Sequence, residues 1–113
     1  MNRHGRPISL VSRSHAWALL ALGGLAFGAT GCGGALYAVT ASSASSKLEQ
    51  AQALGAESYA PYEYYYAREH LAQAMEEAAS ADYGDAIDYA SAAEEYADKA
   101  ITLSRQAHEG AGR

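Results

Sequence analysis

The amino-acid sequence predicts an all-α protein, an antiparallel helical hairpin or small three-helix bundle that follows an N-terminal signal segment. Alanine supplies 22 of the 82 residues after Gly31, and alanine has the highest helix propensity. Apolar residues in this part recur mostly at steps of three or four, as on one face of a helix. Pro61 and Asp82 suit helix starts, and Gly55 suits a helix end. The length allows one small domain.

The first 31 residues have the three-part layout of a secretory signal. Three arginines and no acid precede an uncharged apolar run over 16–29. Small residues then lead to Cys32, the single cysteine of the chain. Positive charge followed by a short apolar helix is typical of an export signal, so residues 1–31 are expected to form a signal peptide.

The string Ala29-Thr30-Gly31-Cys32 resembles the lipobox of bacterial lipoproteins, in which small or aliphatic residues precede a cysteine. The resemblance implies that a diacylglycerol is joined to the Cys32 thiol, that cleavage follows Gly31, and that the new amino group is acylated. It also implies a lipid-anchored protein that faces the periplasm. Some sorting systems read an Asp directly after the cysteine as a signal to retain the protein in the inner membrane. Gly33 stands at that position here, so the resemblance points to the outer membrane.

Two other interpretations of this segment stay open. Residues 16–39 carry no charge, and about 20 apolar residues span a bilayer, so the segment could be an uncleaved single-pass anchor. A cleaved signal without a lipid, leaving an idle thiol, is the second. A lone cysteine excludes an intramolecular disulfide in either case.

The remaining chain is expected to contain a tether, a helical domain and a tail. Residues 32–45 are rich in glycine and serine and predict a flexible tether. Residues 46–108 predict the helical domain, and residues 109–113 a disordered tail. A short first helix ends near Gly55.

The second helix is expected to run from Pro61 to about Ser80, and the third from Asp82 to about Ala107. Each has an apolar face that would turn inward. On the second helix it comprises Tyr64, Ala67, Leu71, Ala74, Met75 and Ala78. On the third it comprises Ala86, Ala90, Ala93, Ala97 and Ile101. Small residues there allow the two helices to pack closely as an antiparallel pair.

Two segments carry a further resemblance. Residues 81–90, ADYGDAIDYA, resemble the turn and second-helix opening of a single tetratricopeptide unit. Together with residues 55–63, GAESYAPYE, they make the chain similar to a family of short, uncharacterised bacterial envelope proteins. These proteins carry a lipoprotein signal, an Ala-Pro motif that opens a helix, and an Asp-Tyr turn before another helix. The resemblance covers about residues 45–107 and implies no established activity.

The charge of the chain excludes one class of partner. Without residues 1–31, five Lys and Arg remain against thirteen Asp and Glu, a formal charge of −8 compared with −5 for the whole chain. Such a surface repels phosphate backbones, so nucleic acid is not expected as a partner. The partners expected are the membrane, through the lipid anchor, and an envelope protein or a second copy of the chain.

The histidines and acids lack the spacing of a catalytic or metal site. His70 and His108 lie on different predicted helices, without a nucleophile motif or a second histidine four residues away. Both are expected to be solvated surface residues. We therefore expect no enzyme activity, no metal and no other cofactor.

Five of the nine tyrosines crowd the start of the second predicted helix. Tyr64 fits the inner face, whereas Tyr62, Tyr65 and Tyr66 point elsewhere around the axis. They either seal the end of the alanine-rich bundle or form a contact surface for a protein, a second copy or a glycan. Tyr62, Tyr65 and Tyr66 are the candidate binding surface.

The combined prediction is a lipid-anchored scaffold or adaptor of the cell envelope that acts by protein–protein binding. Two alternatives remain: an accessory subunit of an envelope enzyme or transporter, and a single-pass membrane protein with an uncleaved anchor.

Overall fold

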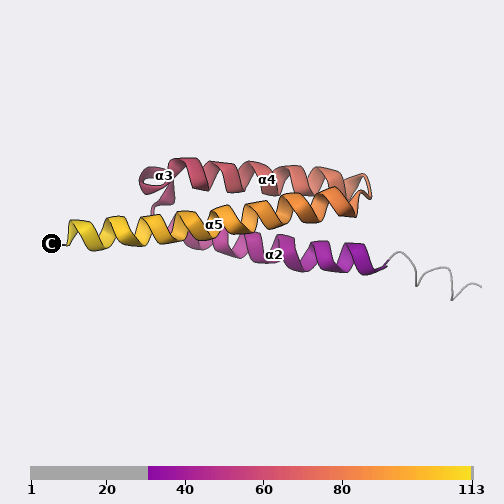
Figure 1. Cartoon of the computed structure of the whole chain (residues 1–113), viewed down its shortest axis with the longest axis horizontal. Coiled ribbons are helices and arrows are strands. Elements are labelled where there is room, and N and C mark those ends of the chain that lie inside the picture. Colours follow the sequence, from indigo (N-terminus) through magenta and orange to yellow (C-terminus); the bar gives the residue numbers. More distant parts are fainter. Residues whose placement is uncertain (1–30, 113) are drawn as a thin grey trace, which may run out of the picture. The chain divides into compact units, whose positions relative to one another are not determined.

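The computed structural model describes residues 31–112, and these residues form helices joined by short turns (Figure 1). The helices are α2 (Gly31–Ala53), α3 (Ala56–Tyr59), α4 (Pro61–Ala79) and α5 (Tyr83–Ala111). No strand occurs between residues 31 and 112, and the predicted all-α class is confirmed.

The three long helices form a bundle in which α4 runs antiparallel to both α2 and α5 (Figure 1). The parallel pairing of α2 with α5 is also visible in its side-chain contacts. Ser43 near the middle of α2 contacts Glu94, and Leu54 just after α2 contacts His108. The α4–α5 pair is the antiparallel hairpin that the sequence predicted, and α2 completes a three-helix bundle.

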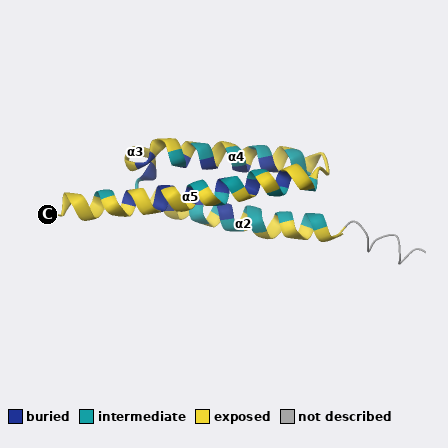
Figure 2. Cartoon of the chain, viewed as in Figure 1, coloured by how far each residue is buried: buried dark blue, intermediate teal, exposed yellow. Residues whose placement is uncertain are grey.

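The core of the bundle is built mainly from alanine. Figure 2 shows the buried residues as dark-blue bands spaced along α4 and α5. On α5, where Ile101 is also buried, six buried positions follow alternating steps of four and three: Ala86, Ala90, Ala93, Ala97, Ala100 and Ser104. On α4 they follow steps of three, four and three: Tyr64, Ala67, Leu71 and Ala74. This is the average 3.5-residue repeat of helices packed along a coiled-coil-like seam.

The predicted helix boundaries are confirmed at three punctuating residues. Pro61 occupies the first turn of α4, where its missing N–H costs no hydrogen bond. Asp82 Oδ1 accepts a hydrogen bond from the Asp85 amide at 3.3 Å and so caps α5. Gly55 lies just beyond α2 with φ of 75°, a left-handed conformation that glycine adopts without a steric penalty.

The expected tether over 32–45 is wrong, because these residues form the first part of α2. Packing against α5 orders them despite their modest helix propensity. Ala44 is fully buried, and Gly33 and Gly34 lie against the Tyr83 side chain. A Cβ at Gly33 would meet the Cβ of Tyr83 at 3.1 Å, so this glycine permits close packing.

Three further expectations can be placed. The expected tail over 109–113 is helical as far as Ala111, where α5 ends. Met75, expected on the inner face of α4, is 55% exposed, because the buried seam steps from Leu71 to Ala74 and leaves the next residue outside it. The expected signal peptide lies outside the described residues, apart from Gly31.

Candidate functional site

Aromatic side chains gather where α4 and α5 meet. Tyr62, Tyr66 and His70 follow one another at four-residue spacing on α4, which places them on one side of that helix. Tyr89 and Tyr96, seven residues apart, lie along one side of α5. We refer to these five residues as the aromatic face.

Ring contacts join the two halves of the aromatic face. The Tyr66 ring centroid lies 3.9 Å from that of His70 and 4.0 Å from that of Tyr96. Tyr62 meets Tyr96 at 6.2 Å, and His70 meets Tyr89 at 5.7 Å, both edge to face. Edge-to-face and offset rings are mutually attractive, so these contacts help to hold α4 against α5.

The two described histidines make specific contacts rather than lying free in solvent. His70 Nδ1 lies 3.0 Å from the Tyr66 carbonyl oxygen, and because a carbonyl only accepts, Nδ1 carries the hydrogen and donates it. His108 Nε2 donates in the same way to the Leu54 carbonyl at 2.9 Å, and its ring meets Tyr59. The expectation of a solvated histidine is therefore wrong for His70, which is half-buried and stacked; His108 is exposed.

The structure brings the three predicted surface tyrosines together around one open hollow of about 450 Å³. Tyr62 is 64% exposed, Tyr65 is 41% exposed, and Tyr66 is half-buried. The residues that line the hollow are Pro61, Tyr62, Tyr65, Tyr66, Glu69 and His70. Tyr64, in contrast, is buried as predicted. Its burial and, to a smaller extent, the nearby Glu57 carboxylate raise the pKa of its phenol.

Two neighbouring hollows are lined by residues that the sequence did not single out as a binding surface. One, of about 420 Å³, is lined by Glu63, Glu95, Asp98, Lys99, Thr102 and Leu103. The other, of about 330 Å³, is lined by His70, Asp85, Asp88, Tyr89 and Ala92. A sequence signal for the α5 side of this region is the seven-residue spacing of Tyr89 and Tyr96, which places both rings on one face of that helix.

Two basic side chains of the chain itself lie over tyrosine rings. The Arg68 guanidinium carbon is 4.7 Å from the centroid of Tyr65, and Lys99 Nζ is 4.2 Å from that of Tyr96. Both distances are within the range of a cation–π interaction. Each cation also pairs with an acid, Arg68 with Glu69 at 3.2 Å and Lys99 with Glu95 at 2.8 Å.

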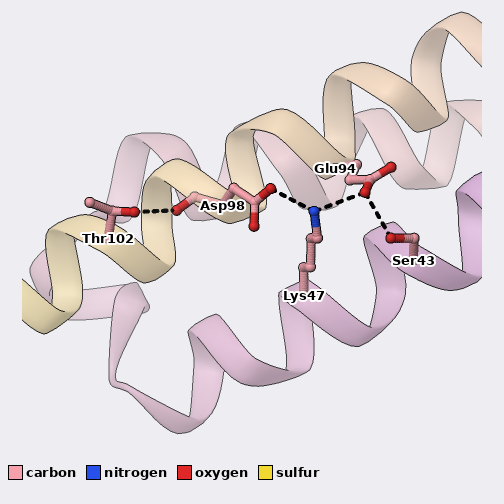
Figure 3. Close-up of polar contacts among 5 residues, drawn as sticks. All are labelled: Ser43, Lys47, Glu94, Asp98 and Thr102. Carbon is pink, nitrogen blue, oxygen red and sulfur yellow. Dashed lines mark hydrogen bonds and ion pairs between the residues drawn. The ribbon is translucent and has the colours of Figure 1, made fainter.

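A separate polar network joins α2 to α5 (Figure 3). Lys47 Nζ lies 2.8 Å from Glu94 and 2.6 Å from Asp98, and the Ser43 hydroxyl donates to Glu94 at 2.8 Å. The hydrogen bonds to Asp98 and Glu94 raise the pKa of Lys47. The hydrogen bonds from Lys47 and Ser43 lower the pKa of Glu94. The network holds the two parallel helices in register. Of its residues, Asp98 lines one of the three hollows, and Ser43, Lys47 and Glu94 line none of them.

The stability of the bundle is expected to fall in acid partly through Glu94. Because folding lowers its pKa, its contribution is present above the ordinary carboxyl pKa and is lost as the pH falls through the lowered value. Between pH 7 and pH 3, the Glu94→Gln variant should therefore lose about 1 kcal/mol less of its unfolding free energy than the unsubstituted protein loses. Urea unfolding at both pH values measures this. Glu49→Gln, an exposed change on α2, is the control, and an equal effect in both variants would contradict the assignment.

Cys32 is a free, exposed thiol at the second position of α2.

At the α4–α5 turn, three acids bring carboxylate oxygens within 4.8 Å of one another: Glu77, Asp82 and Asp85. They are the described residues best placed to hold a cation. Asp82 already has a structural role there as the α5 cap. Among residues 31–112, no helix has the length and apolar character needed to cross a membrane.

Comparison with known proteins relates most of the bundle to one family. The family model described as a domain of unknown function, DUF4398, matches residues 40–111, more than half of the chain. No curated protein and no solved structure matches the chain.

Proposed function

The chain belongs to the DUF4398 family, and we propose that it is a lipid-anchored adaptor or scaffold of the cell envelope that binds a protein partner through Tyr62, Tyr65 and Tyr66. The observation that carries this proposal is the exposure of Tyr62 and Tyr65 around one open hollow. A solvent-exposed aromatic patch favours an interface, because tyrosine supplies a large contact area and a polar tip at low entropic cost.

The position of Cys32 is compatible with the proposed anchor. Its thiol is exposed, so an acyl-transferring enzyme could reach it. Because α2 already includes this residue, the lipid would connect to the bundle through a helix rather than through a flexible tether. Helix α4 begins at the end of the bundle opposite the start of α2 (Figure 1), and Tyr62 is its second residue. At 1.5 Å per residue, α2 itself spans about 30 Å. The tyrosines would then face a partner away from the membrane surface.

The anchor is tested by intact-mass measurement of the protein extracted from membranes. The proposal expects loss of residues 1–31 and added acyl mass, together with release from the membrane fraction in Cys32→Ser. An unmodified full-length chain, or a Cys32→Ser variant with the same acyl mass, would contradict the anchor.

The binding surface is tested by photocrosslinking in cells. A photoreactive phenylalanine at position 65 is expected to form adducts with an envelope protein or with a second copy. The same group at Ser42, an exposed position on α2, is the control and should form few. Equal adducts from both positions would count against a tyrosine interface. A single enzyme or transporter in the adducts would favour the accessory-subunit alternative.

A further inference from the structure

We infer that the hollow lined by Tyr62, Tyr65 and Tyr66, referred to below as the tyrosine hollow, receives a lysine or arginine side chain from a basic segment of the partner protein. The inference rests on the proposed function, because it names the chemistry of the partner at the same tyrosines. Three features carry it: the rings themselves, the cations already seated on neighbouring rings, and the charge of the surrounding surface.

The hollow is open, and Tyr62 offers its most exposed ring, because Tyr66 lies against His70 and Tyr96 and because Arg68 covers Tyr65. Glu69 also lines the hollow, and its carboxylate lies 3.2 Å from the Arg68 guanidinium. Exposed aromatic surface beside a carboxylate is a favourable environment for a cation, since the ring face and the acid both carry negative potential. A neutral apolar side chain would gain nothing from Glu69.

The chain itself shows that tyrosines of this region accept cations. Arg68 covers Tyr65, and Lys99 covers Tyr96, which in turn contacts Tyr62 and Tyr66. Both cations come from the same helix as the ring they cover. Tyr62, the most exposed of the three predicted surface tyrosines, has no such cation among the described residues.

The charge around the three hollows favours a basic partner. Their lining includes six acids and only one Lys or Arg, Lys99, which is paired with Glu95. The six acids are Glu63, Glu69, Asp85, Asp88, Glu95 and Asp98. Glu69, Glu95 and Asp98 already pair with Arg68, Lys99 and Lys47, whereas Glu63, Asp85 and Asp88 have no ion pair among the described residues. A basic segment lying across α4 and α5 could therefore place one side chain in the tyrosine hollow and others near these carboxylates. Such complementarity speeds association and disfavours acidic partners.

The test measures binding of labelled peptides to the full chain by fluorescence anisotropy at 50 mM and 300 mM salt. The probes are a fluorescein-labelled dodecapeptide of alternating arginine and glycine and its glutamate–glycine counterpart, with chitohexaose as a competitor. We expect the arginine peptide to bind more weakly at high salt, the glutamate peptide not to bind, and chitohexaose not to compete.

Paired substitutions separate ring chemistry from apolar area. Tyr62→Leu with Tyr65→Leu keeps apolar side chains but removes the π faces, and should weaken binding about tenfold. Tyr62→Phe with Tyr65→Phe keeps the rings and should change binding less than twofold. Glu69→Gln should weaken binding about threefold, whereas Glu49→Gln on α2 should leave it unchanged. Circular dichroism checks the fold; if the leucine pair loses helicity, the Glu69 and Glu49 variants decide.

Several results would overturn the inference. Equal affinity in the leucine and phenylalanine pairs, equal effects of Glu69→Gln and Glu49→Gln, or competition by chitohexaose would each reject a tyrosine-held cation. If the arginine peptide fails to bind while position 65 still crosslinks to a protein, the inference fails and the proposed function stands. If both fail, the proposed function fails with it.

Discussion

Replacing Ala97 with leucine is expected to lower the free energy of unfolding by about 3 kcal/mol, the upper end of the usual cost of overpacking. Ala97 has no exposed surface and belongs to the cluster in which α2, α4 and α5 meet. Alanine at such positions lets the helix axes approach closely, so three additional heavy atoms can enter only if a helix moves outward. Overpacking of this kind usually costs about 1–3 kcal/mol, and a core of small residues leaves little space to absorb it.

Urea unfolding followed by circular dichroism measures this effect. Ala72→Leu is the matched control, because Ala72 is exposed on α4 and receives the same additional atoms. That variant should change the free energy of unfolding by less than about 0.5 kcal/mol. Similar losses in both variants would show that the cost comes from leucine as a residue type rather than from close packing at Ala97.

The sequence predicted the helices well where their ends carry local signals. Pro61, Gly55 and Asp82 act through their own backbone or through an amide three residues away, so neighbouring residues suffice to identify them. The α5 stripe was equally visible, because Ala86 and Ala97 follow the helical repeat that buries one face.

The tether could not be excluded from local sequence. Glycine and serine over 32–45 predict flexibility when considered alone, and helix formation there depends on a distant partner. Tyr83 packs against Gly33 and Gly34, and Glu94 accepts a hydrogen bond from Ser43. These contacts exist only because α2 lies parallel to α5, a pairing that no local pattern specifies.

The same dependence on distant contacts applied to the aromatic face and to the hollow beside it. Tyr62, Tyr65 and Tyr66 were identified because they crowd one helix turn, and the structure places them around one hollow. The contributions of Tyr89 and Tyr96 depend on the register between α4 and α5. That register is set by packing along the alanine seam, so their contacts with the α4 rings emerge only in the folded bundle.

Leu71 and Met75 give the second large expected effect, because the sequence put both on the inner face of α4 and the structure separates them. Leu71 is 8% exposed and Met75 is 55% exposed. Leu71→Ala should lower the free energy of unfolding by about 2–3 kcal/mol, through lost burial and the cavity left behind. Met75→Ala should change it by less than about 0.5 kcal/mol. Large buried side chains are few in this alanine core, so little could move in to fill the Leu71 cavity. Urea unfolding of the two variants compares them directly, and equal losses would restore Met75 to the core and contradict the 3.5-residue seam.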